Sequence, residues 1–332
     1  MRKLASLFPL GMRRRFLAAH LSSIVGDKIS GRLRITDQAW PDGGRLCIGL
    51  ERNDGDIWLS VNPRVLARRY PYRVLYARMP AVLRVFAGTH PSVRRVSAEM
   101  SDGIEVAPGA LCFSSSRDDV LLIPDVYFIN SGGFEWARKA AKTAPSWTER
   151  DDLIVWRGSA TGSGALADDR MEAANDRLKQ RVRLCLMLRN VEGVDAGIVK
   201  VFRRAKGAQR MALIEHRLIG RRIRERTWAR RKFAIDIDGN TNSWSNFYVR
   251  LLFGCCVIKL VNDLKDRTPH TVIGKRQLEP RACQRGIFET DIQLSRYPIN
   301  LFNVRSFCSN VCHHCNDTPS LRRMQQLFLL FL

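Results

Sequence analysis

Alternation between apolar and polar positions is clearest in the segment KFAIDIDGNTNSWSNFYVRLLFGCCVIK. Its first part, Lys232–Asp238, alternates like a buried strand, and Gly239 ends the pattern. Small hydrogen-bonding residues follow over Asn240–Asn246, and an apolar run with helical spacing covers Phe247–Phe253. Cys255–Ile258 has the composition of a second buried strand. The segment therefore predicts a strand, a polar loop, a short helix and another strand.

Other parts of the chain carry patterns of the same kinds. Asn53-Asp54-Gly55 is a hairpin signal between two alternating runs. Pro124 interrupts the apolar run Val120–Ile129, which predicts two short extended pieces. The remaining predictions are strands at Arg45–Glu51, Asp56–Val61, Asp151–Trp156 and Gly193–Val199 and a helix over Asp168–Asn190. Strands that alternate with helices predict an α/β protein with mostly parallel sheets.

Polar loops follow two of the predicted strands. The first, Trp156–Gly164, offers a cation, hydroxyls and glycines, and glycines let backbone N–H groups approach a phosphate closely. It is not a P-loop, because no lysine follows its last glycine at the required spacing. The second, Asn240–Asn246, opens a helix whose first N–H groups and dipole favour an anion. Alone, the first loop is better explained as an ordinary turn, but together the loops predict a nucleotide diphosphate in an α/β crevice.

Net charge restricts the class of partner. The 332-residue chain has 55 Lys and Arg against 32 acidic residues, a formal charge of +23. An anionic partner is therefore expected, namely a phosphorylated substrate, an acidic lipid surface or nucleic acid; the alternative is a solvated arginine-rich surface. The basic, partly amphipathic start of the chain, with Arg13–Arg15, predicts contact with an anionic membrane surface. No apolar run reaches the length of a membrane-spanning helix.

Neither the cysteines nor the acidic pairs predict a metal site. The nine cysteines are scattered, several in apolar runs, which favours buried free thiols in a reducing compartment. Cys308–Cys315 contains three cysteines and two histidines, but no second ligand pair is obvious, so zinc is the minor interpretation. Asp236-Ile237-Asp238 matches the Asp-x-Asp pattern of a metal-binding motif. Alternation places both carboxylates on one face of a strand, and a structural role is preferred to metal binding. No metal or cofactor is expected.

Two long motifs carry a resemblance to a known family. DDLIVWRGSATG, followed by Arg170, and the segment Lys232–Lys259 together resemble glycosyltransferase family 90, which includes protein O-glucosyltransferases, capsule-associated transferases and lipopolysaccharide-type enzymes. Ser101-Asp102-Gly103 and Cys112–Phe128 fit the same pattern, so the resemblance extends from about Val96 to Lys259. It implies inverting transfer of a sugar from a UDP-sugar by a GT-B-like α/β enzyme, with two Rossmann-type domains and a donor cleft between them.

The resemblance also implies roles for particular residues. Asp102 is the base that takes the acceptor's hydroxyl proton, although by itself it is an ordinary turn aspartate. The O-glucosyltransferase branch has an arginine near the position of Ser245, so the cation that neutralises the leaving phosphate is Arg157, Arg170 or Arg250. The acceptor is a glycan or glycolipid such as a lipopolysaccharide core, reached in the cytoplasm at the inner face of the membrane. The implied donor-binding residues are Arg157, Gly158, Ser159, Arg170, Asn240, Thr241, Asn242, Ser243, Trp244 and Ser245.

Three regions are expected along the chain. Residues 1–145 form an acceptor-side α/β domain, 146–260 the nucleotide-sugar donor domain, and 261–332 an atypical tail. The resemblance stops after Lys259, which predicts a reading-frame shift near Leu260 or a decayed, inactive copy with an incomplete C-terminal part. The rival function is a basic nucleic-acid-binding protein. The chain has no recognisable helix-turn-helix, RNA-recognition or zinc-finger pattern, and its aromatics are not interleaved with the basic clusters, so nucleic acid is not the expected partner.

Overall fold

A computed structural model describes most of the chain up to residue 262. The described ranges are 8–25, 31–40, 44–103, 106–115, 117, 119–201, 207–240 and 245–262, with the backbone of 291–292 and 299–302. The chain divides into two compact units, and it passes from unit 1 to unit 2 at Gly133–Phe134, ahead of helix α6 (Glu135–Lys142). The sequence analysis placed this boundary near residue 145, after that helix.

Unit 1 is built on a six-stranded mixed sheet of order β1-β3-β2-β4-β5-β6. Strands β2 and β3 form the predicted hairpin, with Asp54 (φ 47°) and Gly55 (φ 83°) in its turn, because a two-residue hairpin loop favours two left-handed residues. β2 also pairs antiparallel with β4, whereas the other three pairings are parallel, so the sheet is mixed. The strands are β1 (Leu33–Thr36), β2 (Cys47–Asn53), β3 (Asp56–Val61), β4 (Arg95–Glu99), β5 (Leu111–Cys112) and β6 (Leu121–Leu122).

Helices pack on this sheet through apolar side chains at helical spacing. In α4, Tyr72, Leu75, Met79 and Phe86 recur every three to four residues or multiples of that interval, and all are buried. The helices of unit 1 are α2 (Leu10–Val25), α3 (Pro63–Ala67), α4 (Arg69–Ala87) and α5 (Val126–Asn130). Helix α5 corrects a prediction, because Val120–Ile129 was expected to be extended throughout. The Asp125 side chain accepts hydrogen bonds from the N–H groups of Tyr127 and Phe128 and so caps a helix there.

Unit 2 contains four parallel strands in the order β8-β7-β9-β10. Beyond β10, β12 pairs antiparallel with β10, and β11 pairs antiparallel with β12. The strands are β7 (Asp151–Ser159), β8 (Val194–Lys200), β9 (Arg231–Ile237), β10 (Cys256–Asn262), β11 (Asp291–Ile292) and β12 (Ile299–Phe302). The helices are α6, α7 (Gln180–Leu188), α8 (Gly207–Glu215) and α9 (Ser245–Leu252), with short 3-10 turns η2 (Trp147–Glu149) and η3 (Glu225–Arg230). The chain is therefore mixed α/β, as the alternation predicts.

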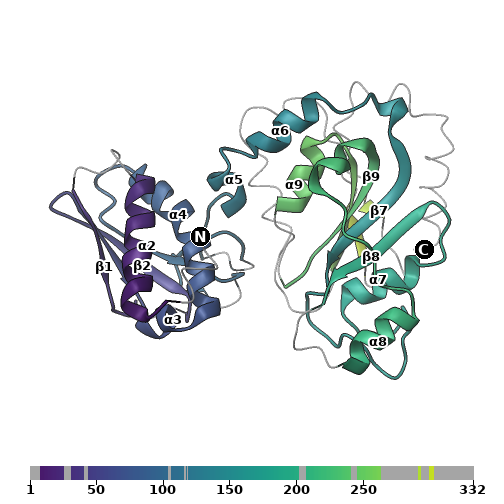
Figure 1. The fold of residues 1–332 in the computed structure, drawn as a ribbon, viewed down its shortest axis with the longest axis horizontal. Helices are drawn as coiled ribbons and strands as arrows, with labels where there is room; N and C mark the ends of the chain where they lie inside the picture. Colours follow the sequence, from purple (N-terminus) through teal and green to yellow (C-terminus); the bar gives the residue numbers. More distant parts are fainter. Residues whose placement is uncertain are drawn as a thin grey trace. The chain divides into compact units, whose positions relative to one another are not determined.

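Both faces of this sheet are covered by apolar side chains. Ile154 and Trp156 of β7 face a core that includes Val182 and Cys185 of α7, whereas Val155 between them faces the core shared with α6 and α9. Figure 1 shows α7 and α9 on opposite sides of the β7–β9 pair. None of the helices in the described parts of the chain is long and apolar enough to cross a membrane.

The predicted helix over Asp168–Asn190 is wrong in its first half. Only Gln180–Leu188 is helical, and the residues before it form turns. Asn175 donates a side-chain hydrogen bond to the Asp168 carboxylate (2.9 Å), and its own side-chain oxygen accepts one from the Arg177 N–H (3.1 Å). Short polar side chains compete in this way with the backbone bonds of a helix, which composition alone does not reveal.

Candidate functional site

The strand order of unit 2 reverses between β7 and β9. From β7 the chain runs through α7 to β8 on one side, and β9, the next strand, pairs with the opposite edge of β7. The helices that follow β7 and β9 consequently lie on opposite faces of the sheet. In an open parallel sheet, this reversal leaves a crevice at the carboxyl ends of the two strands, and ligands bind there. The topology therefore places a candidate site at the residues that follow Ser159 and Ile237.

The two polar loops meet at this crevice. The backbone N–H of Gly162 donates to the side-chain oxygen of Asn240 at 3.0 Å, in an exposed position. Their approach is close, because a Cβ on Gly239 would lie 2.6 Å from the Thr161 hydroxyl oxygen, and that side chain would have to shift. Gly162 itself has φ +104°, a conformation that disfavours other residues. Asn240 and the glycine loop, which the sequence proposed as parts of one site, are thus adjacent.

Two cations that the sequence analysis did not name stand at the same crevice. The Arg181 guanidinium donates to the carbonyls of Ser159 (3.0 Å) and Asp238 (3.0 Å) and so joins the carboxyl ends of β7 and β9. It also donates to the Thr161 hydroxyl at 2.6 Å. The Lys179 ammonium donates to the carbonyl of Gly162. Both residues lie at the start of α7, so they were hidden inside the longer helix that composition predicted.

Burial acts on both of these cations. It lowers the pKa of Lys179 below its ordinary value, because desolvation disfavours the charged ammonium. It also lowers the pKa of Arg181, and the carboxylates of Asp236 and Asp238 oppose that shift. The sequence signal that could have revealed Lys179 and Arg181 is the basic tripeptide Lys-Gln-Arg. It lies directly before the apolar run of a short helix and downstream of a glycine-rich loop.

Arg157, Gly158 and Ser159 lie in β7 rather than in the loop after it, because β7 pairs with β8 as far as Ser159. The Arg157 guanidinium binds the Asp195 carboxylate at 2.6 Å and donates to the carbonyl of Arg221 at 2.9 Å. Its side chain is only 10% exposed. Arg157 therefore ties β7 to β8 and to the segment before η3, whereas only the carbonyl of Ser159 reaches the crevice cations.

The other residues named from the resemblance are placed as follows. The Arg250 side chain is buried in α9, 2.6 Å from Glu225, and its guanidinium lies over the Trp228 ring. Burial lowers the pKa of Arg250 and the Glu225 carboxylate opposes that shift. Arg170 is exposed in the turns before α7, and Ser245 begins α9. Thr241, Asn242, Ser243 and Trp244 lie outside the described residues.

Asp236 and Asp238 share one cation beneath the second loop. The Lys259 ammonium, on the neighbouring strand β10, lies 2.7 Å from the Asp236 carboxylate and 2.5 Å from that of Asp238. Both carboxylates thus point to one face of β9, as alternation predicted. Burial alone would lower the pKa of Lys259, but the two carboxylates outweigh that effect and raise it. This triad fixes the strand end that carries Gly239 and Asn240.

Asp102 belongs to unit 1, in a turn directly after β4. Its carboxylate, 32% exposed, accepts a hydrogen bond from Arg78 at 2.9 Å. The same guanidinium donates to the carbonyls of Met100 and Ser101, each at 2.6 Å. Arg78 therefore fixes both the turn and the carboxylate that the turn presents.

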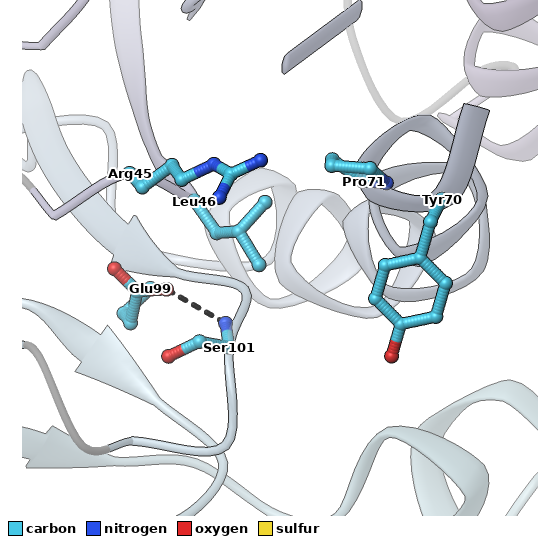
Figure 2. A pocket seen from close by; sticks show the side chains of 6 residues that line it. All are labelled: Arg45, Leu46, Tyr70, Pro71, Glu99 and Ser101. Carbon is cyan, nitrogen blue, oxygen red and sulfur yellow. Dashed lines mark hydrogen bonds between the residues drawn. The ribbon is translucent and has the colours of Figure 1, made fainter. Parts of the chain in front are cut away.

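A pocket of about 200 Å³ lies beside this turn. Figure 2 shows the buried Glu99 carboxylate, which accepts a hydrogen bond from the Ser101 N–H at 2.7 Å, with Tyr70 of α4 across the opening. The residues that line it are Arg45, Leu46, Tyr70, Pro71, Glu99 and Ser101. Polar groups and one aromatic ring thus stand next to the proposed base.

Gly103 is required by the packing of this turn, which gives a first prediction. A Cβ on Gly103 would lie 1.5 Å from the Ser114 carbonyl oxygen, and the residue has φ +82°. We expect Gly103→Ala to lower the free energy of unfolding by about 3 kcal/mol, because strain and overlap add. Gly109→Ala is the matched control, since Gly109 also has positive φ (+69°) but open space around its Cβ position, and about 1 kcal/mol is expected. Equal losses in urea unfolding would show that the close contact with Ser114 is unimportant.

Metal ligands are not gathered at either site. Among the described residues, no group of three or more His, Cys, Asp or Glu side chains could hold a metal ion. The cluster Cys308–Cys315 falls in the tail, outside the described residues, and the reading-frame shift near Leu260 stays a prediction. The chain matches no protein-family model and no curated protein sequence.

Proposed function

We propose that unit 2 binds the diphosphate of a UDP-sugar at the carboxyl ends of β7 and β9. The observation that carries this proposal is the meeting of Gly162, Asn240 and the cations Lys179 and Arg181 at the strand-order reversal. An amide side chain and two cations match the oxygens of a diphosphate. The resemblance to glycosyltransferase family 90 favours a sugar nucleotide over other nucleotides.

The proposed reaction is inverting sugar transfer by a GT-B-like enzyme. Asp102 takes the proton of the acceptor hydroxyl while that oxygen attacks the anomeric carbon. The departing diphosphate develops charge, which fixed cations stabilise. Lys179 suits this role better than Arg157 or Arg250, because its ammonium is held by a loop carbonyl rather than by a carboxylate. The acceptor is a glycan or a lipopolysaccharide core at the inner face of the cytoplasmic membrane.

Calorimetric titration with UDP tests the crevice, and it gives the second prediction. We expect Lys179→Met to weaken UDP binding by about tenfold or more, because a hydrogen bond to a charged group contributes roughly 1.5–3 kcal/mol. The side chain is only partly buried, so the variant should remain folded. Lys139→Met, at a largely exposed lysine of α6, is the control for loss of one positive charge and should bind like the wild type.

Two outcomes would contradict the proposal. Equal weakening by both lysine variants would mean that net charge, rather than the crevice, attracts UDP. No UDP binding by folded wild-type protein would favour the alternative of an inactive remnant of the family.

A further inference from the structure

The helical layer of unit 1 is free of acidic residues. No Asp or Glu occurs in residues 1–25 or in residues 57–98, which include α2, α3 and α4. The same segments contain arginines throughout, among them Arg13–Arg15, Arg68 and Arg69. A basic protein usually mixes both signs on its surface. The three helices themselves therefore carry only basic charges, and of the α2 arginines Arg14 pairs with Asp37 outside the helices, at 2.9 Å.

These helices lie together. The Arg13 guanidinium donates to the carbonyls of Leu66 (3.2 Å) and Ala67 (2.7 Å), and the Tyr72 hydroxyl donates to the carbonyl of Arg13 at 3.0 Å. The first turn of α2 is thereby fixed against the junction of α3 and α4, and Figure 1 shows α2 beside α3. Arg68 and Arg69, at the junction, therefore lie close to the first turn of α2.

Large apolar side chains are exposed on the same surface. Met12 and Phe16 are each 42% exposed and stand four residues apart, on the helix side opposite the buried Leu17 and Leu21. The Phe8 ring lies against that of Phe16, with centroids 5.1 Å apart. Arg15 lies next to Phe16 in the chain and is exposed, as are Arg68 and Arg69 at the junction. We call this set the arginine–aromatic surface; its members are Phe8, Met12, Arg15, Phe16, Arg68 and Arg69.

We infer that the arginine–aromatic surface binds the anionic face of a lipid bilayer. Phe8, Met12 and Phe16 would enter the boundary between headgroups and acyl chains, where burial of apolar area drives binding. Arginine guanidinium groups pair with lipid phosphates, and each cation near an anionic leaflet adds to the affinity. A nucleic acid is the less suitable partner, because Met12 offers no ring for base stacking. This inference concerns unit 1 alone and is independent of what the unit 2 crevice binds.

Flotation of the full chain with lipid vesicles tests the surface. We expect the protein to float with vesicles of phosphatidylcholine containing about one third phosphatidylglycerol, and to bind pure phosphatidylcholine at least tenfold less. Phe16→Ser and the double change Arg68→Gln/Arg69→Gln should each lower the partition coefficient by about tenfold. These side chains are exposed, so circular dichroism should show native folding of both variants. Raising the salt to about 1 M should weaken binding, because the Debye length then falls to about 3 Å.

Controls come from a second basic and apolar site, on α8 of unit 2. Arg210 and Met211 are exposed there, and Arg210→Gln and Met211→Ser should float like the wild type. Equal binding to neutral and anionic vesicles, or equal loss with the α8 controls, would overturn the inference. A shift of duplex DNA that is lost in the arginine variant but kept in Phe16→Ser, without vesicle binding, would overturn it in favour of nucleic acid.

Discussion

Replacing Lys259 by methionine should lower the free energy of unfolding by about 3–5 kcal/mol, because it leaves two buried carboxylates without their shared cation. Asp236 and Asp238 are 7% and 8% exposed in their side chains, and Lys259 contacts both. Methionine has a side chain of similar length and flexibility, so the loss of stability measures the removal of the charge rather than the creation of a cavity. Urea unfolding followed by tryptophan fluorescence would measure it.

A control separates this effect from the loss of any lysine. Lys139 pairs with Glu135 across one turn of α6, and both side chains are more than half exposed, so Lys139→Met should leave the unfolding midpoint nearly unchanged. Adding Asp236→Asn to Lys259→Met should recover part of the lost stability, since it removes one of the two carboxylates that Lys259 contacts. Similar midpoints for Lys259→Met and Lys139→Met would contradict the triad's structural role.

The pH dependence follows from the direction of the Lys259 pKa. Because the folded-state pKa is raised above the ordinary value of 10.5, the ammonium contributes its full stabilisation below about pH 10.5. That contribution is lost as the pH rises through the folded-state pKa. The difference in unfolding free energy between wild type and Lys259→Met should therefore be constant near neutrality and should narrow in strongly alkaline solution.

Local pattern predicted the strands of unit 2 well and the position of its cations poorly. Lys232–Asp238 and Gly193–Val199 are strands within one residue at each end, because a short run rich in apolar residues and bounded by turn residues is a local signal for a strand. The end of β7 was misplaced, since pairing with β8, a non-local contact, extends that strand through Ser159. Arg157 therefore points to Asp195 of β8, although its position after a strand and before glycines suggested a ligand contact.

The contacts that define both candidate sites join residues far apart in sequence. Arg181 reaches the carbonyls of Ser159 and Asp238, and Arg78 reaches Asp102. No spacing rule relates these positions. The reversal of strand order brings Arg181 to the ends of β7 and β9, and the packing of α4 on the sheet brings Arg78 to Asp102. The glycine and asparagine residues of the loops could be chosen from sequence, since turns require those residue types locally.

In the proposed reaction, Asp102→Asn should lower kcat by about 10²–10⁴-fold, the usual contribution of a general base. Asparagine has nearly the same shape and can still accept a hydrogen bond from Arg78, but it cannot take up the acceptor's proton. The affinity for UDP should not change, because the proposed nucleotide site lies in unit 2 and Asp102 in unit 1. Release of UDP from a panel of UDP-sugars with a glycan acceptor would measure kcat, and calorimetry the affinity.

Asp119→Asn is the matched control for this experiment. Asp119 is another aspartate of unit 1 that pairs with an arginine, Arg117, and both are exposed, so its loss should affect neither kcat nor UDP binding. Asp102→Glu would distinguish a role in proton transfer from a role in folding. It keeps a carboxylate, so it should retain more activity than Asp102→Asn at equal stability. Full turnover by Asp102→Asn would assign the base to another residue. A parallel loss of UDP affinity would instead mean that Asp102 supports folding, since a residue that acts only on the acceptor hydroxyl has no influence on the empty donor site.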